Sequence, residues 1–155
     1  MKRAVCVLVF GLMFVLGSAA VQAATPTPID GSVSGIELCP QFICGFAAFT
    51  GIFNGQIGNN HHALGIVSTA LNHTPLPVLT TDKPATILPG GVWKLQTLSG
   101  TIAGAVLGGS ITLVSDKLFH VVIFLITSDA KLVVFDGTLD HHPLIPTFSG
   151  SFATP

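Results

Sequence analysis

Alternation between apolar and polar residues is the feature that most constrains how this chain can fold. In Phe49–Ile57, every second residue is a phenylalanine, an isoleucine or a glycine, and the residues between them are mostly polar. Residues 92–98 repeat the pattern, since Trp93 and Leu95 fall on one face while Lys94 and Gln96 fall on the other. Successive side chains of a β-strand point to opposite faces. A period of two therefore predicts β structure, and no segment has a convincing helical period.

These patterns favour a single all-β domain of about seven to nine antiparallel strands. A small closed barrel is the expected architecture, because glycine-punctuated strands suit strong coiling and closure leaves no exposed strand edges. A β-sandwich is the alternative. We also expect the apolar segment Leu118–Thr127 to be either a central strand or a strand covered on both faces. Residues 100–114 are expected to form two strands joined around Gly108 and Gly109.

The N-terminus has the three parts of a cleavable secretory signal. Lys2 and Arg3 supply positive charge, residues 5–16 are nearly all apolar, and small residues lead up to Ala23. An uncleaved membrane anchor is the alternative, but the apolar run is shorter than the roughly 20 residues of a spanning helix. The sequence therefore predicts a signal peptide over residues 1–23, a flexible lead-in over residues 24–30, and one β domain over residues 31–155.

Export predicts a secreted or periplasmic location for the mature chain. That chain keeps four lysines and seven acidic residues, a net charge of −3, and has no arginine or tyrosine. A nucleic-acid partner is not expected, because phosphate binding needs clustered Lys or Arg. Membrane association is not expected after cleavage, because a helical hairpin over residues 98–127 is too short in its second half. An outer-membrane β-barrel is the other membrane alternative, and the absence of tyrosine and of paired aromatic girdles is evidence against it. With hydrophobic residues at 49% and charged residues at 8%, we expect extensive burial, and a homo-oligomer is a candidate assembly.

Cys39 and Cys44 are the cysteines that remain when the signal, with Cys6, is removed. In an oxidising compartment this pair predicts a disulfide. The alternative is half of a metal site, although a structural zinc site normally uses four Cys or His ligands.

Two pairs of segments in the chain are similar to each other. Phe49–Ile57 and Leu98–Val106 have glycines at matching places, and Leu71–Leu76 shares an Asx-His-x-Pro-Leu pattern with Leu139–Leu144. The interpretation is a β domain with two similar halves, in which the second segments end strands with turns. Chance similarity among Gly- and Pro-rich β sequences is the alternative.

Histidine is the candidate functional residue type, because a chain so poor in charge contains six histidines. Imidazole is a common metal ligand and acid–base group. If the two halves pack with pseudo-symmetry, His73 and His141 would be equivalent, and both are candidate metal ligands. Asp140 could bind the same metal or orient a ring. The candidate binding residues are therefore His73, Asp140, His141 and His142; the alternative is that they only complete turns.

No catalytic motif is present, since the chain lacks a Gly-x-Ser-x-Gly elbow, a phosphate loop and a dinucleotide fingerprint. The sequence favours an exported non-catalytic binding or structural β domain and leaves open whether the protein is an enzyme. One alternative is a barrel that holds a small apolar ligand, or an enzyme that acts on one, with His and Asp residues at its mouth. Another is a secreted metal-binding protein that uses the histidines; no cofactor besides a metal is indicated.

Overall fold

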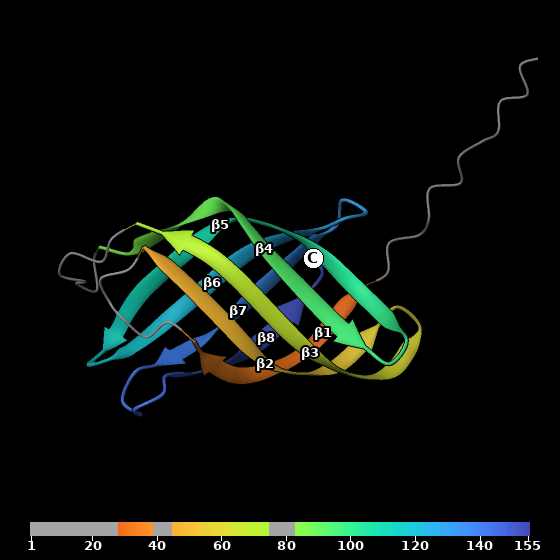
Figure 1. Ribbon diagram of the computed structural model, residues 1–155, viewed down its shortest axis with the longest axis horizontal. Coiled ribbons are helices and arrows are strands. Elements are labelled where there is room, and N and C mark those ends of the chain that lie inside the picture. The colour runs from red at the N-terminus through yellow and green to blue at the C-terminus, as the bar shows by residue number, and fades with distance from the viewer. Residues whose placement is uncertain (1–27, 39–44, 75–82) are drawn as a thin grey trace, which may run out of the picture.

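Eight antiparallel strands close into a barrel in the computed structural model, which describes residues 28–38, 45–74 and 83–155 (Figure 1). Each strand pairs with the next along the chain, and β1 pairs with β8 to complete the ring. The strands are β1 (Ile29–Glu37), β2 (Phe46–Ile57), β3 (Asn60–His73), β4 (Ala85–Thr97), β5 (Gly100–Ser115), β6 (Leu118–Thr127), β7 (Leu132–Asp140) and β8 (Thr147–Ala153). The prediction of a small all-β barrel is confirmed, although its first strand begins within the segment expected to be a flexible lead-in.

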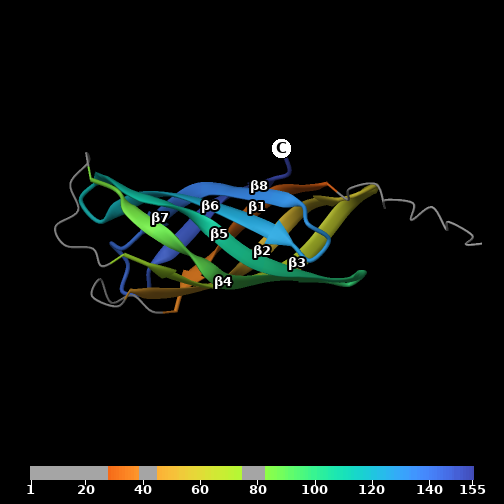
Figure 2. The same ribbon diagram turned by 90° about the horizontal axis from the view of Figure 1, so that it is seen from above.

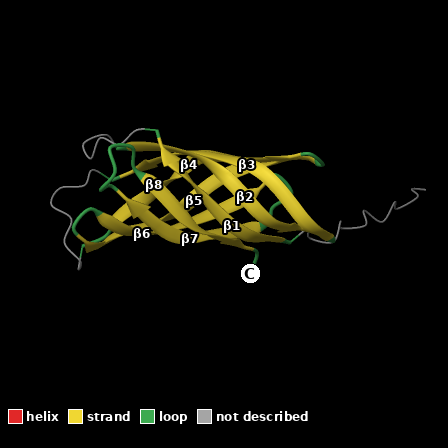
Figure 3. Ribbon diagram, turned by 90° about the horizontal axis from the view of Figure 1, so that it is seen from below, coloured by secondary structure: helices red, strands yellow, loops and turns green. Residues whose placement is uncertain are grey.

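The two ends of the barrel differ in the parts of the chain that they contain (Figures 2 and 3). At one end, Ile29 donates its backbone N–H to the Thr154 hydroxyl at 2.8 Å, so the first and last described strands meet there. We call this the terminal end. The other end, which we call the loop end, contains the last residues of the odd-numbered strands, such as Glu37 and His73.

Side chains fill the interior of the barrel. In β4, Trp93 and Leu95 are buried while Lys94 and Gln96 are exposed, as the alternation predicts. The interior cavity measures only about 20 Å³, which is enough for about one water molecule. Small-molecule sites usually occupy roughly 300–1,000 Å³, so the described interior has no room for such a ligand without repacking.

Paired glycines make room for the phenylalanine rings of the core. Gly31 of β1 lies directly opposite Gly55 of β2. A methyl group built on Gly31 would stand 2.6 Å from the Cα of Gly55 and 2.9 Å from the Phe53 ring. The ring therefore covers the glycine pair, and a larger residue at position 31 would force the two strands apart or displace Phe53. Gly31 thus contributes to packing rather than to a turn.

Trp93 connects two strands that are not neighbours. Its indole Nε1 donates a hydrogen bond of 3.0 Å to the carbonyl oxygen of Ile126 on β6. Trp93 lies opposite Gly104 in the β4–β5 pairing, and the absence of a side chain there lets the indole reach past β5. A buried indole N–H needs such an acceptor.

One local expectation was wrong, and a second holds only in part. Residues 100–114 lie in one strand, β5, because a bulge in its pairing with β6 between Val106 and Gly108 bends the strand without ending it. Gly108 has a φ of 145°, a conformation that favours glycine. β6, expected to be central or covered on both faces, has a paired strand on each side, but it is not covered on both faces, because the outward Phe124 is 43% exposed. The described chain itself supplies no cover for that face.

The similar segments are only partly equivalent in space. β3 and β7 both run toward the loop end and stand four strands apart in the ring of eight, so His73 and Asp140 end strands on opposite walls. β2 and β5, which contain the other similar pair, run in opposite directions. One rotation about the barrel axis cannot relate both pairs, so the two-halves interpretation does not describe the fold.

Candidate functional site

The four candidate residues lie at the loop end. His73 is the last residue of β3, Asp140 is the last residue of β7, and His141 and His142 follow it directly. All four residues therefore lie at one end of the barrel, but His73 comes from the wall opposite the other three residues. Within the described ranges, no group of three or more His, Cys, Asp or Glu side chains is arranged to hold a metal ion.

His73 is buried, and its imidazole contacts the backbone of the next residue in the chain. Its Nδ1 lies 2.8 Å from the carbonyl oxygen of Thr74. Because a carbonyl only accepts hydrogen bonds, Nδ1 must carry the proton. The backbone N–H of His73 also donates to the carbonyl of Gly45 at 3.0 Å. These contacts favour a role for His73 in ending β3 at the mouth of the barrel.

His141 forms a buried ion-pair contact with Glu37, a residue that sequence reasoning did not select. The Nε2 atom of His141 lies 2.9 Å from Oε2 of Glu37, and the two side chains are only 7% and 6% exposed. The ring of Phe119 packs edge-on against the imidazole, with centroids 5.2 Å apart. Burial in an apolar setting strengthens the attraction but also makes it costly to remove either partner.

The Glu37–His141 pair fastens the end of β1 to the connection between β7 and β8. The backbone N–H of Glu37 also donates to the carbonyl of Pro146 at 2.9 Å, so side chain and backbone bind the same connection. Neither residue lines the interior cavity or the two surface hollows described below. This geometry favours a structural clamp over an acid–base pair that meets a substrate.

Asp140 and His142 form a separate, exposed contact. The backbone N–H of His142 donates to Oδ1 of Asp140 at 2.8 Å, and the His142 Nδ1 lies 2.6 Å from the same oxygen. Both hydrogen bonds lower the pKa of Asp140, and the backbone hydrogen bond has the larger effect. The contact is local to a turn. The predicted disulfide between Cys39 and Cys44 lies outside the described residues.

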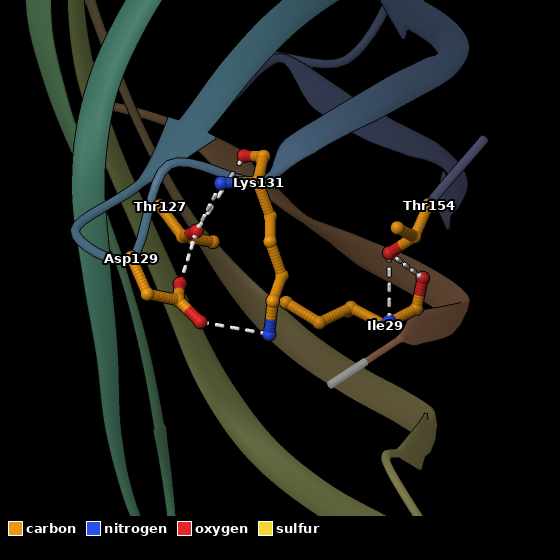
Figure 4. A network of polar contacts seen from close by, with 5 residues as sticks. All are labelled: Ile29, Thr127, Asp129, Lys131 and Thr154. Carbon is orange, nitrogen blue, oxygen red and sulfur yellow. Dashed lines mark hydrogen bonds and ion pairs between the residues drawn. The ribbon is translucent and has the colours of Figure 1, made fainter. Parts of the chain in front are cut away.

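A second polar network lies at the terminal end, in the turn between β6 and β7 (Figure 4). The Thr127 hydroxyl donates to Oδ1 of Asp129 at 2.5 Å and accepts the backbone N–H of Lys131 at 2.9 Å. The Lys131 ammonium lies 2.7 Å from Oδ2 of Asp129. The hydrogen bond from Lys131, followed by that from Thr127, lowers the pKa of Asp129.

This network borders a pocket of about 310 Å³ at the terminal end. Ile29, Ile57 and Ile102 form its apolar part, and Lys131 lies at its rim with a side chain only 10% exposed. Because the Lys131 ammonium is already paired with Asp129, the rim presents a neutralised ion pair rather than a free charge. Nothing in the sequence singled out Lys131, since its burial depends on the closure of the barrel.

The outer face of β2–β6, which we call the outer wall, carries almost no charge. These five strands contain 12, 14, 13, 16 and 10 residues, and their one Asp, Glu, Lys or Arg residue is Lys94. The solvated face of an antiparallel sheet normally alternates with polar residues. An uncharged wall of this extent is therefore unusual for a surface that faces water.

Apolar side chains form a continuous line across the outer wall. Each of six outward-facing residues lies directly opposite the next one on the adjacent strand. We call them the apolar row: Ala48, Ala70, Val92, Ala105, Ile126 and Leu132. Val92 at its centre is 62% exposed. On the terminal side of the row, Ile52 and Ile66 lie opposite each other and are also exposed.

The outer wall is hollowed over β2–β5. A groove of about 590 Å³ crosses these strands, and small residues such as Ala48, Ser68, Ala70 and Ala103 line much of it. The opposite side of the barrel is different, because β1 and β8 present outward serines. Ser34 lies opposite Ser149 there, and both are exposed. On the outward faces of the described strands, the contiguous apolar surface therefore lies on one side of the barrel.

Comparison with known proteins gives no family for this chain, since no family model, curated protein or solved structure matches it. In the part of the chain that the structure describes, no helix has the length and apolar character needed to cross a membrane.

Proposed function

We propose that this protein is an exported, non-catalytic β-barrel that acts as a binding or structural module through its outer wall. One observation carries the proposal: five consecutive strands contain a single charged residue, and an apolar row crosses their outward faces. Contiguous exposed apolar surface marks interaction sites on soluble proteins. The cores of protein interfaces are also depleted of charged residues.

The filled interior supports a contact surface on the outside of the barrel. A cavity of about 20 Å³ cannot accept a ligand of drug-like size. The buried pair of Glu37 and His141 does not line the interior cavity, the pocket or the groove. His73 and His142 take part in local contacts. The outer wall extends over five strands with a single Asp, Glu, Lys or Arg residue, so it offers a partner a broad surface of uniform character.

The neutral apolar dye Nile red tests the binding surface on dilute protein. Val92→Glu places a carboxylate at the centre of the apolar row, and Ser149→Glu places one on the opposite side of the barrel as a matched control. Both positions face outward, so both variants should keep the far-UV circular dichroism of the wild type. We expect Val92→Glu to reduce dye binding severalfold and Ser149→Glu to leave it unchanged. Equal dye binding by both variants would overturn the proposal.

Export is tested by the mass and N-terminal sequence of the protein recovered after secretion. Cleavage after Ala23 predicts a chain that begins at Ala24. A recovered chain that retains residues 1–23 would contradict the predicted signal peptide.

A further inference from the structure

We infer that the partner of the outer wall is a second copy of this chain, docked through β2–β5 about a two-fold axis. The inference rests on the proposed function, because it names the partner of the same surface. Charge distribution, shape and size each support it.

The charges of the barrel lie away from the docking surface. The described acidic residues are Asp30 and Glu37 on β1, Asp116 and Asp129 in turns, and Asp136 and Asp140 on β7. A partner recognised by complementary charge would find only Lys94 on the outer wall. An identical uncharged wall is a better match, since burying it leaves few charges without partners. Lys94 lines the groove and lies directly opposite Ser68, so its flexible stem has to direct the ammonium away from the axis.

The shape of the surface fits its own copy. The groove is lined by the directly paired Ala48 and Ala70 and, on its terminal side, by the directly paired Thr50 and Ser68. The exposed Ile52 lies just beyond it, next toward the terminal end. In a two-fold contact both copies use the same patch, so if one residue contacts a second residue of the partner, the second residue also contacts the first residue of the partner. An axis near Thr50 and Ser68 would therefore place the isoleucine ridge of each copy in the groove of the other. The small side chains at the axis would allow the two walls to approach closely.

The surface is also large enough for a stable dimer. β2–β5 contain 12, 14, 13 and 16 residues, and alternate residues face outward. The wall therefore presents roughly two dozen side chains, within the 20–30 residues that each side of a standard interface uses. Because β1 and β8 are polar outside, as Ser34 and Ser149 illustrate, the contact has one favourable face and a dimer rather than an open polymer is expected.

Charge substitutions at Thr50 test the two-fold axis by sedimentation equilibrium of the exported protein, from about 1 to 100 μM. We expect a dimeric wild type. Thr50→Glu and Thr50→Lys each bring like charges together at the axis and should weaken association at least tenfold. An equal mixture of the two variants should restore dimers, because opposite charges then meet. Ser149→Glu is the matched control and should remain dimeric.

Two further measurements keep the result interpretable. Circular dichroism and the thermal midpoint report whether the Thr50 variants fold, and Val92→Glu replaces them if they do not. Added sodium chloride should leave the wild-type dimer intact, because salt screens ionic contacts but does not weaken apolar ones.

Three outcomes would overturn the inference. A wild type that stays monomeric throughout this range has no self-partner, while the Nile red comparison would still decide whether the outer wall binds apolar ligands. Thr50 variants that remain dimeric place the contact on another face. A monomer that floats with neutral phosphatidylcholine vesicles, and fails to float as Val92→Glu, has a lipid surface as its partner instead.

Discussion

The Oε2 atom of Glu37 lies 2.9 Å from the Nε2 atom of His141, and both side chains are almost fully excluded from water. The contact joins β1 to the segment after β7, two parts of the chain that are far apart in sequence. It is a buried contact between two polar side chains at the end of an otherwise apolar core. Its energetic role therefore differs from that of the exposed contact between Asp140 and His142.

Removing His141 should destabilise the barrel strongly. His141→Ala leaves the buried Glu37 carboxyl group without its partner, which typically costs about 1–3 kcal/mol in the free energy of unfolding. Replacing both residues with leucine should recover much of the loss, because no unpaired polar group then remains buried. Urea unfolding measures both effects. His142→Ala is the control. If His141→Ala lowers the free energy of unfolding no more than His142→Ala does, the Glu37–His141 contact is not a structural clamp.

The turn at Asp129 should lose its contribution to stability in acid. A pKa lowered in the folded state stabilises the fold above the unfolded pKa and loses that effect as pH falls through the folded value, which here means below about pH 4. Lys131→Met removes the main cause of the shift. The pKa of Asp129 should then rise toward its ordinary value in a carbon-13 NMR titration. The pKa of Asp140, which His142 lowers, should stay the same. An unchanged pKa of Asp129 in the Lys131→Met variant would contradict the assigned cause.

Gly31→Ala should destabilise the barrel although alanine is apolar and small. Its methyl group would stand 2.7 Å from the carbonyl oxygen of Asn54 and 2.9 Å from the Phe53 ring. Overpacking of this kind typically costs about 1–3 kcal/mol. The neighbouring Ser34→Ala faces outward and should have little effect in the same urea series. Equal stability of the two variants would show that β1 and β2 can separate without penalty.

Trp93→Phe should cost more than the lost ring volume alone. The substitution removes the indole donor and leaves the Ile126 carbonyl without this hydrogen bond, for which about 1–3 kcal/mol is typical. Phe124→Leu, on an exposed site of β6, serves as the comparison. Thermal unfolding followed by circular dichroism suits both variants. If Trp93→Phe unfolds at the wild-type temperature, the indole bond does not stabilise the fold.

Alternation along single strands was enough to predict the barrel and many inward-facing residues. Trp93 and Leu95 were assigned to the core from a local pattern, and the structure buries both. Local pattern could not separate a turn from a bulge at Gly108, because a glycine with positive φ serves in either. It also could not show that Phe124 lacks a cover, since a doubly apolar strand looks the same in sequence whether its cover comes from the same chain or from a partner.

The site was harder to predict, because its contacts join distant strands. Sequence placed His73, Asp140 and His141 at one end of the domain but gave no signal for Glu37, whose partner is brought to it by closure of the ring. The apolar row could not be predicted for the same reason. Ala70 and Val92 have no distinctive spacing in the chain and become neighbours only through the register of β3 and β4.

Hydroxyl-radical footprinting of the exported protein tests the central role of the outer wall most directly. The measurement compares labelling of Ile52, Ile66 and Val92 with labelling of Leu144, which is 97% exposed at the loop end, in dilute and concentrated solution. We predict that the outer-wall residues lose labelling relative to Leu144 as the concentration rises, and that Thr50→Glu abolishes this loss. Labelling of Ile52, Ile66 and Val92 that stays in constant proportion to Leu144 at every concentration would contradict the account.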